Sequence, residues 1–306
     1  MKVTALAGGV GAARFLTGLV QHIKPLDLTV IANTGDDIEL FGLHISPDVD
    51  IVTYTLAGIV DEAKGWGIKS DTFYFLEALK GYGVDAWFNI GDRDLATHIY
   101  RTTQLGQGKT LAEVTANISR NLGLKTTILP MSNCHFQTKI KTYIGTMHFE
   151  EYFVKHRFQL EVLGIEFEGA DSATAAPGVL EAILQADLVV VCPSNPLVSV
   201  QTILSVKGVR DAMRQTYARV VGVSPIVGGK AIKGPADRML RAMGFEASAA
   251  SVAGLYSDFM DVFVIDEQDF AEVPRIRALG VEVVVADTVM RSLADKAELA
   301  KTVLGA

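Results

Sequence analysis

Carboxylates are concentrated in a short stretch near the N-terminus, directly after a run of apolar residues. Asp36, Asp37, Asp48 and Asp50 fall within fifteen residues, and the preceding segment 28–32 is typical of a buried strand. Open α/β sheets bind ligands outside the carboxyl ends of their strands. Carboxylates in that place could hold Mg²⁺, which prefers oxygen ligands. The alternative is that Asp36 and Asp37 only cap a turn, since Gly-Asp is common turn chemistry.

A glycine-rich loop separates the first predicted strand, residues 2–7, from a predicted helix over residues 12–22. The loop consists of Gly8, Gly9, Val10 and Gly11. Glycines let a phosphate approach the backbone, and a helix N-terminus offers it free N–H groups. Interpreted as G-x-G-x-x-G, the loop has Arg14 in place of the third glycine, and Asn33 stands where an NAD-binding protein has an acid. The loop therefore predicts a phosphate or nucleotide site that is not a nicotinamide site, with a plain tight turn as the alternative.

Three further segments carry side chains that could contact a ligand. Arg93, between Asp92 and Asp94, suits bidentate phosphate binding, although acids in a first helical turn also complement the helix dipole. Trp66 lies between two glycines, where a planar ligand could stack on the indole, or the ring could be core. Ser194 and Asn195 follow the apolar run 188–192 and could bind phosphate or ribose, or only cap a helix.

These segments lie on an alternation of strands and helices that predicts an α/β fold. We interpret residues 1–306 as a single Rossmann-like domain with a mostly parallel sheet flanked by helices. Residues 136–170 change character, with alternating polar and apolar positions and then aromatic residues and acids, and we interpret them as a smaller inserted lobe. Strands are predicted over 2–7, 28–32, 188–192, 220–224, 262–265 and 281–286, and helices over 12–22, 51–60, 71–80, 95–104, 110–122, 198–204, 238–243 and 288–304.

The composition narrows the classes of partner. The net charge is −7, and no basic run or stripe is present, so nucleic acid is not an expected partner. No apolar run approaches the roughly 20 residues of a membrane-spanning helix. The two cysteines, Cys134 and Cys192, are far apart and have no metal-ligand spacing, which favours a reducing, cytoplasmic compartment.

Taken in order, these motifs resemble the 2-phospho-L-lactate transferase family of coenzyme F420 biosynthesis. The resemblance runs over nearly the whole chain. Its most specific segments are Gly-Asp-Arg-Asp-Leu-Ala-Thr-His at 91–98 and Pro-Ser-Asn-Pro at 193–196, and the others are residues 8–16, 33–37, 46–50, 65–67 and 130–132. It implies a Rossmann-like fold, usually in a homodimer. It also implies that a phosphorylated three-carbon acid, 2-phospho-L-lactate or phosphoenolpyruvate, moves from a guanosine-diphosphate-linked donor to the deazaflavin Fo with Mg²⁺ present, which releases GMP and forms coenzyme F420-0 or its dehydro form.

The resemblance also implies roles for single residues. An acid matching Asp50 and a residue matching Asn89 contact Fo in the family; some relatives have a basic residue at the second position, a charge that Asn89 lacks. We expect Asp36 and Asp50 to hold Mg²⁺, Asp50 to orient the attacking hydroxyl, and Arg93 to neutralise charge. Trp66 is expected against Fo. The nucleotide is expected at Gly8, Gly9, Val10, Gly11, Asn33, Ser194 and Asn195.

Two other functions are compatible with a glycine loop. One is a non-enzymatic regulator that binds nucleotide sugars, as proposed for the related gluconeogenesis-factor family. The other is a nucleotide-dependent oxidoreductase, which the missing third glycine and the missing acid at the end of the second strand oppose.

Overall fold

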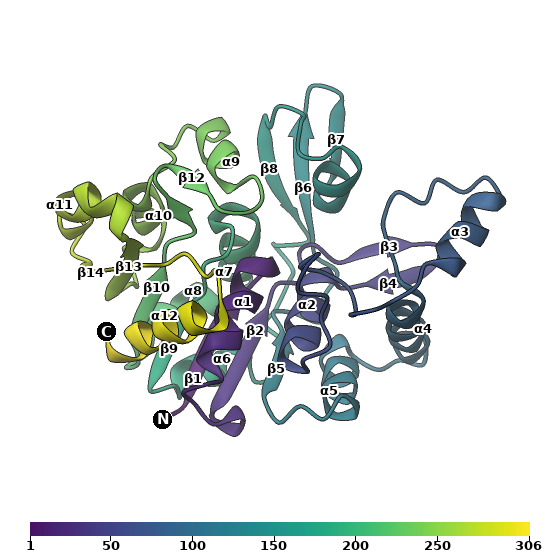
Figure 1. The fold of residues 1–306 in the computed structure, drawn as a ribbon, viewed down its shortest axis with the longest axis horizontal. Helices are drawn as coiled ribbons and strands as arrows, with labels where there is room; N and C mark the ends of the chain where they lie inside the picture. Colours follow the sequence, from purple (N-terminus) through teal and green to yellow (C-terminus); the bar gives the residue numbers. More distant parts are fainter.

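The computed structural model describes residues 1–306 and is centred on a seven-stranded sheet (Figure 1). All neighbouring strands are parallel, and the strand order reverses next to the first strand, which confirms the predicted Rossmann-like fold. From one edge to the other the strands are β14 (Glu282–Ala286), β13 (Val262–Asp266), β10 (Arg219–Val223), β9 (Leu188–Val191), β1 (Val3–Ala7), β2 (Leu28–Ala32) and β5 (Thr127–Pro130).

The central strands are apolar along their whole length because both faces of the sheet are covered. In β9, Val189 and Val191 belong to one hydrophobic core of 41 buried residues, while Leu188 and Val190 belong to a second core of 23. Successive side chains of a strand point to opposite faces, so one uninterrupted apolar run supplies both cores.

Helices cover the two faces unequally. The smaller core is covered by α1 (Gly9–Leu19) and α12 (Leu293–Gly305), which pack against each other, and by α2 (Pro47–Leu56). No helix of the chain is long and apolar enough to cross a lipid bilayer. The larger core is covered by α6 (Val179–Leu184), α7 (Gln201–Ser205), α8 (Val209–Gln215), α9 (Ala236–Ala242), α10 (Ala249–Tyr256) and α11 (Val273–Arg277).

Three smaller sheets project from this body. The predicted insert contains the antiparallel strands β6 (Gln137–Thr142), β7 (Gly145–His148) and β8 (Gly164–Glu168), with a π-helical turn η2 (Glu151–Lys155) after β7. A two-stranded sheet pairs β11 (Ile226–Val227) with β12 (Lys230–Ala231). The hairpin of β3 (Ile38–Leu40) and β4 (Leu43–Ile45) was not predicted, because its turn residues Phe41 and Gly42, both at positive φ, lack the usual Asn-Gly signal.

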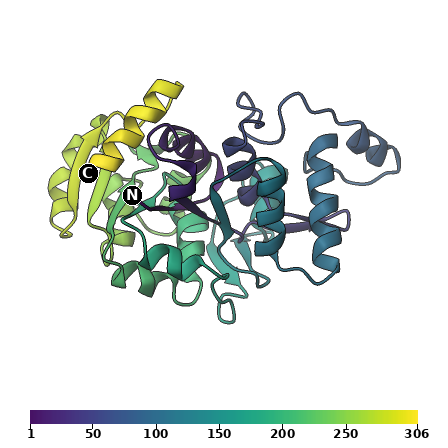
Figure 2. The ribbon, with the colours of Figure 1, turned by 90° about the horizontal axis from the view of Figure 1, so that it is seen from below.

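The end of the molecule that bears this hairpin also carries α3 (Tyr74–Gly81) and α4 (Asp92–Gly106), while the C-terminal helix lies at the other end (Figure 2). The helix predicted over 110–122 is α5 (Leu111–Asn121), which begins with a capping box of Thr110 and Glu113.

Several predicted helix boundaries are wrong. The helix expected over 51–60 is α2, which ends at Leu56; it begins at Pro47, a residue whose fixed φ suits a first helical position and already favoured a helix start there in the sequence. The helix expected from position 288 begins only at Leu293, after a capping box at Ser292, and the helix expected from position 71 begins at Tyr74.

Candidate active site

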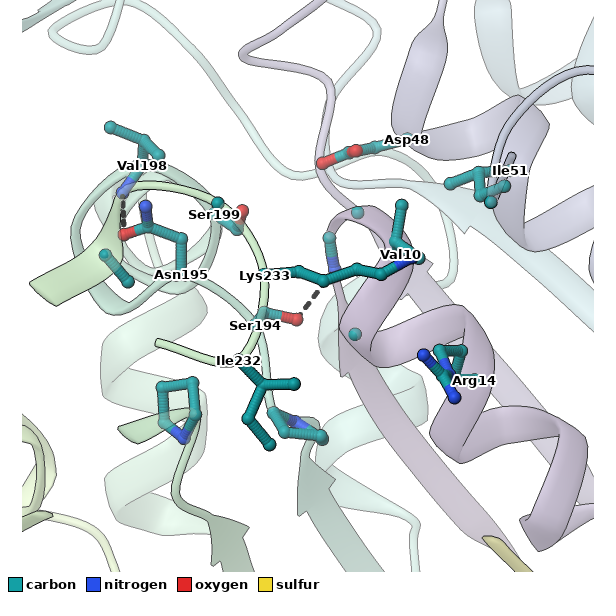
Figure 3. A pocket seen from close by; sticks show the side chains of 18 of the residues that line it. Val10, Arg14, Asp48, Ile51, Ser194, Asn195, Val198, Ser199, Ile232 and Lys233 are labelled. Carbon is teal, nitrogen blue, oxygen red and sulfur yellow. Dashed lines mark hydrogen bonds between the residues drawn. The ribbon is translucent and has the colours of Figure 1, made fainter. Parts of the chain in front are cut away.

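A cavity of about 540 Å³ lies where the sheet reverses its strand order, at the carboxyl ends of β1 and β9 (Figure 3). The loops that follow these two strands meet there, and the backbone N–H of Gly8 donates a hydrogen bond to Ser194 Oγ at 3.1 Å. The cavity lining includes all of the predicted glycine loop, Ser194, Asn195, Trp66 and Asp36. Crevices at such switch points bind the nucleotides of this fold class.

The glycine loop forms the first turn of α1, so its N–H groups lie at the cavity. A Cβ atom at Gly11 would lie 2.2 Å from the carbonyl oxygen of Pro193, and Gly9 has a φ of +70°. Only glycine allows the two loops to pack this closely. Asn195 lines the cavity and also caps the π-helical turn η3 (Pro196–Val200), since its Oδ1 accepts from the Leu197 N–H at 3.0 Å.

Three buried carboxylates, Asp36, Asp48 and Glu150, line the same cavity. Burial raises the pKa of all three because it penalises the charged form, to about 6 for Asp48 and to about 8 for Glu150. Asp48 also raises the pKa of the other two, so the three negative charges lie close enough to repel one another. Asp48 belongs to the carboxylate-rich stretch of the sequence, but the metal was expected at Asp36 and Asp50, and sequence reasoning missed Glu150.

Asn33 orients Asp48. Its Nδ2 donates to Asp48 Oδ2 at 2.9 Å, and its Oδ1 accepts from the Gly35 N–H at 2.9 Å. Asn33 is fully buried and does not line the cavity. The structure therefore places this predicted nucleotide ligand behind Asp48.

Asp50 does not line the cavity and is not brought together with Asp36. Asp48 and Asp50 are two positions apart on α2, and side chains with this spacing point to different sides of a helix. Asp50 pairs with the fully buried Arg101 of α4, and its Oδ2 lies 3.7 Å from His98 Nδ1. Burial raises the pKa of Asp50, although Arg101 and His98 oppose the shift.

Asp94 completes this buried network between α2 and α4. Its Oδ1 lies 3.4 Å from His98 Nε2 and accepts from the Tyr54 hydroxyl at 2.7 Å. Asp50 Oδ2, His98 Nε2 and Arg101 Nε have no hydrogen-bond partner although they are buried. The contacts of the network lie within the chain, and the predicted roles of Asp50 toward Mg²⁺ and Fo remain predictions.

The Gly91–Asp94 turn anchors two helices to each other. Asp92 accepts from the Tyr74 and Phe75 N–H groups at the start of α3, and Asp71 accepts from the Arg93 and Asp94 N–H groups in the first turn of α4. The guanidinium of Arg93 is exposed and donates to the Lys69 carbonyl at 3.1 Å, outside the cavity lining. These contacts agree with the alternative interpretation of this turn, in which its acids stabilise the start of a helix.

The two residues predicted to contact Fo beside Asp50 differ in their placement. Trp66 lines the cavity and is 38% exposed, with its ring edge-on to Phe73 at a centroid distance of 6.4 Å. Asn89 is exposed and lies outside the lining.

Three cations line the cavity, and sequence reasoning missed them all. Arg14 donates to the Met290 carbonyl and Arg291 pairs with Asp287 at 2.8 Å, whereas the Lys233 ammonium lies beside Gly65 and Val10 without an ion-pair partner (Figure 3). Lys233 belongs to a glycine- and lysine-rich segment, residues 228–234, whose composition is the signal that could have identified it.

The carboxylates fit a divalent cation completed by a substrate. No three His, Cys, Asp or Glu side chains converge as a metal site within the protein. Mg²⁺ is usually held by one or two carboxylates together with substrate phosphates and water. Asp36 and Asp48 supply such a pair, and the buried Asp36 Oδ1 has no partner in the chain.

The metal-free protein is expected to gain stability when the pH falls from about 8 to about 5. The pKa of Glu150 is about 8 and that of Asp48 about 6 in the folded chain, so over this window the folded state holds protons that the unfolded chain has lost; His148, with a folded pKa of about 4, opposes part of this gain at the acidic end. Each pKa unit corresponds to about 1.4 kcal/mol, so the gain is on the order of a few kcal/mol. Thermal unfolding in a chelator would measure it. Glu150→Gln should remove most of the dependence and Glu151→Gln none of it; a melting temperature that is constant between these pH values would contradict the expectation.

Comparisons with known proteins find similarity over nearly the whole chain. The family model described as 2-phospho-L-lactate transferase CofD matches residues 3–302. A phosphoenolpyruvate transferase of Streptomyces griseus subsp. griseus is 44% identical over 310 residues, covering 99% of this chain and 98% of that protein. A 2-phospho-L-lactate transferase of Methanosarcina mazei is 38% identical, with 98% of each chain covered.

A solved structure shares the fold at much lower identity. A UPF0052 family member from Bacillus halodurans superposes with a TM-score of 0.66 at 17% identity, covering 99% of this chain and 98% of that one. At this level of sequence identity, the similarity shows only that the two proteins share a fold.

Proposed function

The chain belongs to the 2-phospho-L-lactate transferase family, and on this basis we propose that it transfers a phosphorylated three-carbon acid from a guanosine-diphosphate-linked donor to Fo, releasing GMP. The observation that supports the proposal most strongly is the lining of one cavity. It combines a glycine loop at a helix N-terminus, two neighbouring carboxylates and a group of aromatic side chains. The proposed donor acid is phosphoenolpyruvate, because the relatives with that name are 43–44% identical and those named for 2-phospho-L-lactate are 37–38% identical. The product would then be dehydro coenzyme F420-0.

The donor would lie along the glycine loop. The backbone of the glycine loop at the start of α1, with Ser194 and Asn195, can hold the diphosphate. We propose that Asp36 and Asp48, in place of the expected pair Asp36 and Asp50, hold Mg²⁺, which would neutralise phosphate charge. Transfer at phosphorus depends mainly on positioning and charge neutralisation.

The acceptor would lie against the aromatic wall. Trp66, Phe88, Phe149 and Phe153 give the cavity a largely apolar side that suits a planar deazaflavin. In the proposed reaction, a hydroxyl of Fo attacks the phosphorus nearer the three-carbon acid, and the bond from that phosphorus to the GMP oxygen breaks.

We assign charge neutralisation on the leaving nucleotide to Lys233, because Arg93 lies outside the cavity lining. Lys233→Met is expected to lower kcat by about a hundredfold, the effect of removing one charge-stabilising group from a transition state. The measurement is steady-state turnover, with Lys233→Arg expected to retain part of it. Lys230→Met is a matched control, since Lys230 is exposed on the same segment and outside the lining. Equal effects of the two methionine variants would contradict the role.

The assembly and compartment are also proposals. We propose a homodimer, on family resemblance, and a cytoplasmic location, because both cysteines are free thiols.

Product mass tests the reaction. The protein would be incubated with Mg²⁺, Fo and each guanosine-linked donor in turn, and the products would be identified by mass spectrometry. The phosphoenolpyruvate product should be two hydrogen atoms lighter than the phospholactate product. A folded, Mg²⁺-loaded protein that forms no Fo product with any donor would refute the proposal, and titration with nucleotide sugars would then test the regulator alternative.

A further inference from the structure

Glu150 is a buried carboxylate that no group of the chain neutralises. It lies between β7 and η2 in the three-stranded lobe, its side chain lines the cavity, and the residue is only 6% exposed. Burial and the negative charge of Asp48 raise the pKa of its carboxyl group, Asp36 is a second negative neighbour, and no hydrogen bond or cation of the chain opposes the shift. Buried ionisable groups are normally paired, so an unpaired one that lines a ligand cavity indicates a functional role.

The backbone around Glu150 is held in place by His148. The Glu150 N–H donates to His148 Nδ1 at 3.1 Å, so His148 Nε2 carries the proton and donates to the Asp37 carbonyl at 3.1 Å. Burial, followed by the positive charge of Lys139, lowers the pKa of His148 to about 4, which keeps the ring neutral. His148 thereby links the lobe to the loop that carries Asp36.

Aromatic packing gives the same segment a rigid wall. Phe149 and Phe153 stack with ring centroids 5.6 Å apart and planes 9° apart, and both line the cavity on either side of Glu150 in the sequence. The aromatic surface proposed for Fo and the Glu150 carboxylate therefore come from one short segment. An acceptor stacked on this wall would bring its own hydroxyl groups near the carboxylate.

We propose that Glu150 is the general base that accepts the proton of the attacking Fo hydroxyl, an assignment that rests on the function proposed above. The hydroxyl O–H bond breaks and its proton moves to a carboxylate oxygen of Glu150. The oxygen forms the new bond to phosphorus, and the electron pair of the broken P–O bond leaves with GMP. A general base works best when its pKa lies near the operating pH, and burial shifts that of Glu150 in this direction.

Glu150→Gln and Glu150→Ala, assayed with saturating Mg²⁺, Fo and donor, test the assignment. Loss of a general base should lower kcat by about 10²- to 10⁴-fold with little change in either KM. Formate should restore part of the turnover of the alanine variant, because a small carboxylate can enter the vacated space, and acetate should restore less. Glu151→Gln is the matched control, since Glu151 pairs with Lys155 at 3.6 Å outside the cavity lining.

Each result decides the assignment. Turnover of Glu150→Gln within about threefold of wild type overturns it, as does a large loss in Glu150→Ala that formate does not relieve. A raised Mg²⁺ requirement in Glu150→Gln would make the residue a metal ligand and also overturns it. Because Gln keeps the shape and removes a buried unpaired charge, the variant should melt no lower than wild type. A wild-type protein that forms no Fo product refutes the proposed function, and the base assignment with it.

Discussion

Asp48→Asn is expected to lower turnover by about a thousandfold while the protein stays folded. Asp48 lines the cavity, and with Asp36 it is proposed to hold Mg²⁺. The amide keeps an oxygen that can accept from Asn33 Nδ2, now 2.9 Å from Asp48 Oδ2, so the local packing should survive. The lost negative charge weakens metal binding and, with it, the stabilisation of charge in the transition state, on which phosphoryl transfer chiefly depends.

Turnover at increasing Mg²⁺ concentration would measure this effect. The variant should need more Mg²⁺ and should not reach the wild-type rate at saturation, whereas its melting temperature without metal should rise, because a buried charge has been removed. Glu39→Gln, an exposed change on the neighbouring hairpin, is the control. An unchanged rate with an unchanged Mg²⁺ requirement would refute the assignment of Asp48.

Asp50→Asn is expected to destabilise the fold by about 3–5 kcal/mol, the cost of leaving one member of a buried ion pair without its partner. The remaining member is Arg101, which is fully buried, and His98 would also lose a negative charge that lies 3.7 Å away. Urea unfolding, monitored for wild type and variant, gives the difference. Combining Asp50→Asn with Arg101→Met should recover part of the stability, since it removes both charges.

The double variant, Asp50→Asn with Arg101→Met, also tests the predicted contact of Asp50 with Fo. If the role of Asp50 is confined to the ion pair, the double variant should turn over normally below its melting temperature. If Asp50 also contacts Fo, the KM for Fo should remain high in the double variant although stability is restored. A stability change below about 1 kcal/mol in Asp50→Asn would contradict the structural role.

Local sequence patterns were sufficient for the fold. The apolar runs at 28–32 and 188–192 match β2 and β9 to within one residue, because a strand buried on both faces must be apolar throughout. The glycine loop was identified for a related reason: close approach of two backbones admits no side chain at Gly11, so the residue type itself reports the geometry. The family followed from the order of such motifs along the whole chain.

Which carboxylates share the site was decided by tertiary structure. Asp48 and Asp50 look equivalent in the sequence, but a helix that begins at Pro47 turns one toward the cavity and the other toward Arg101. Helical spacing puts them on different sides of a helix that starts at Pro47, yet it could not say which side faced the ligand. Glu150 and Lys233 lie 100 or more residues after the carboxylate stretch 36–50, and no local pattern indicates that they reach the same cavity.

The amino-acid sequence by itself thus determined the parallel sheet, the phosphate loop and the family, because each depends on residue types at neighbouring positions. The tertiary structure alone decided the membership of the site, because a cavity is formed by chain segments that meet only after the sheet has assembled. The physical reason is that the sequence specifies which side chains are present but not where they point. Their directions are set when α2, the lobe and the 228–234 segment pack around β1 and β9.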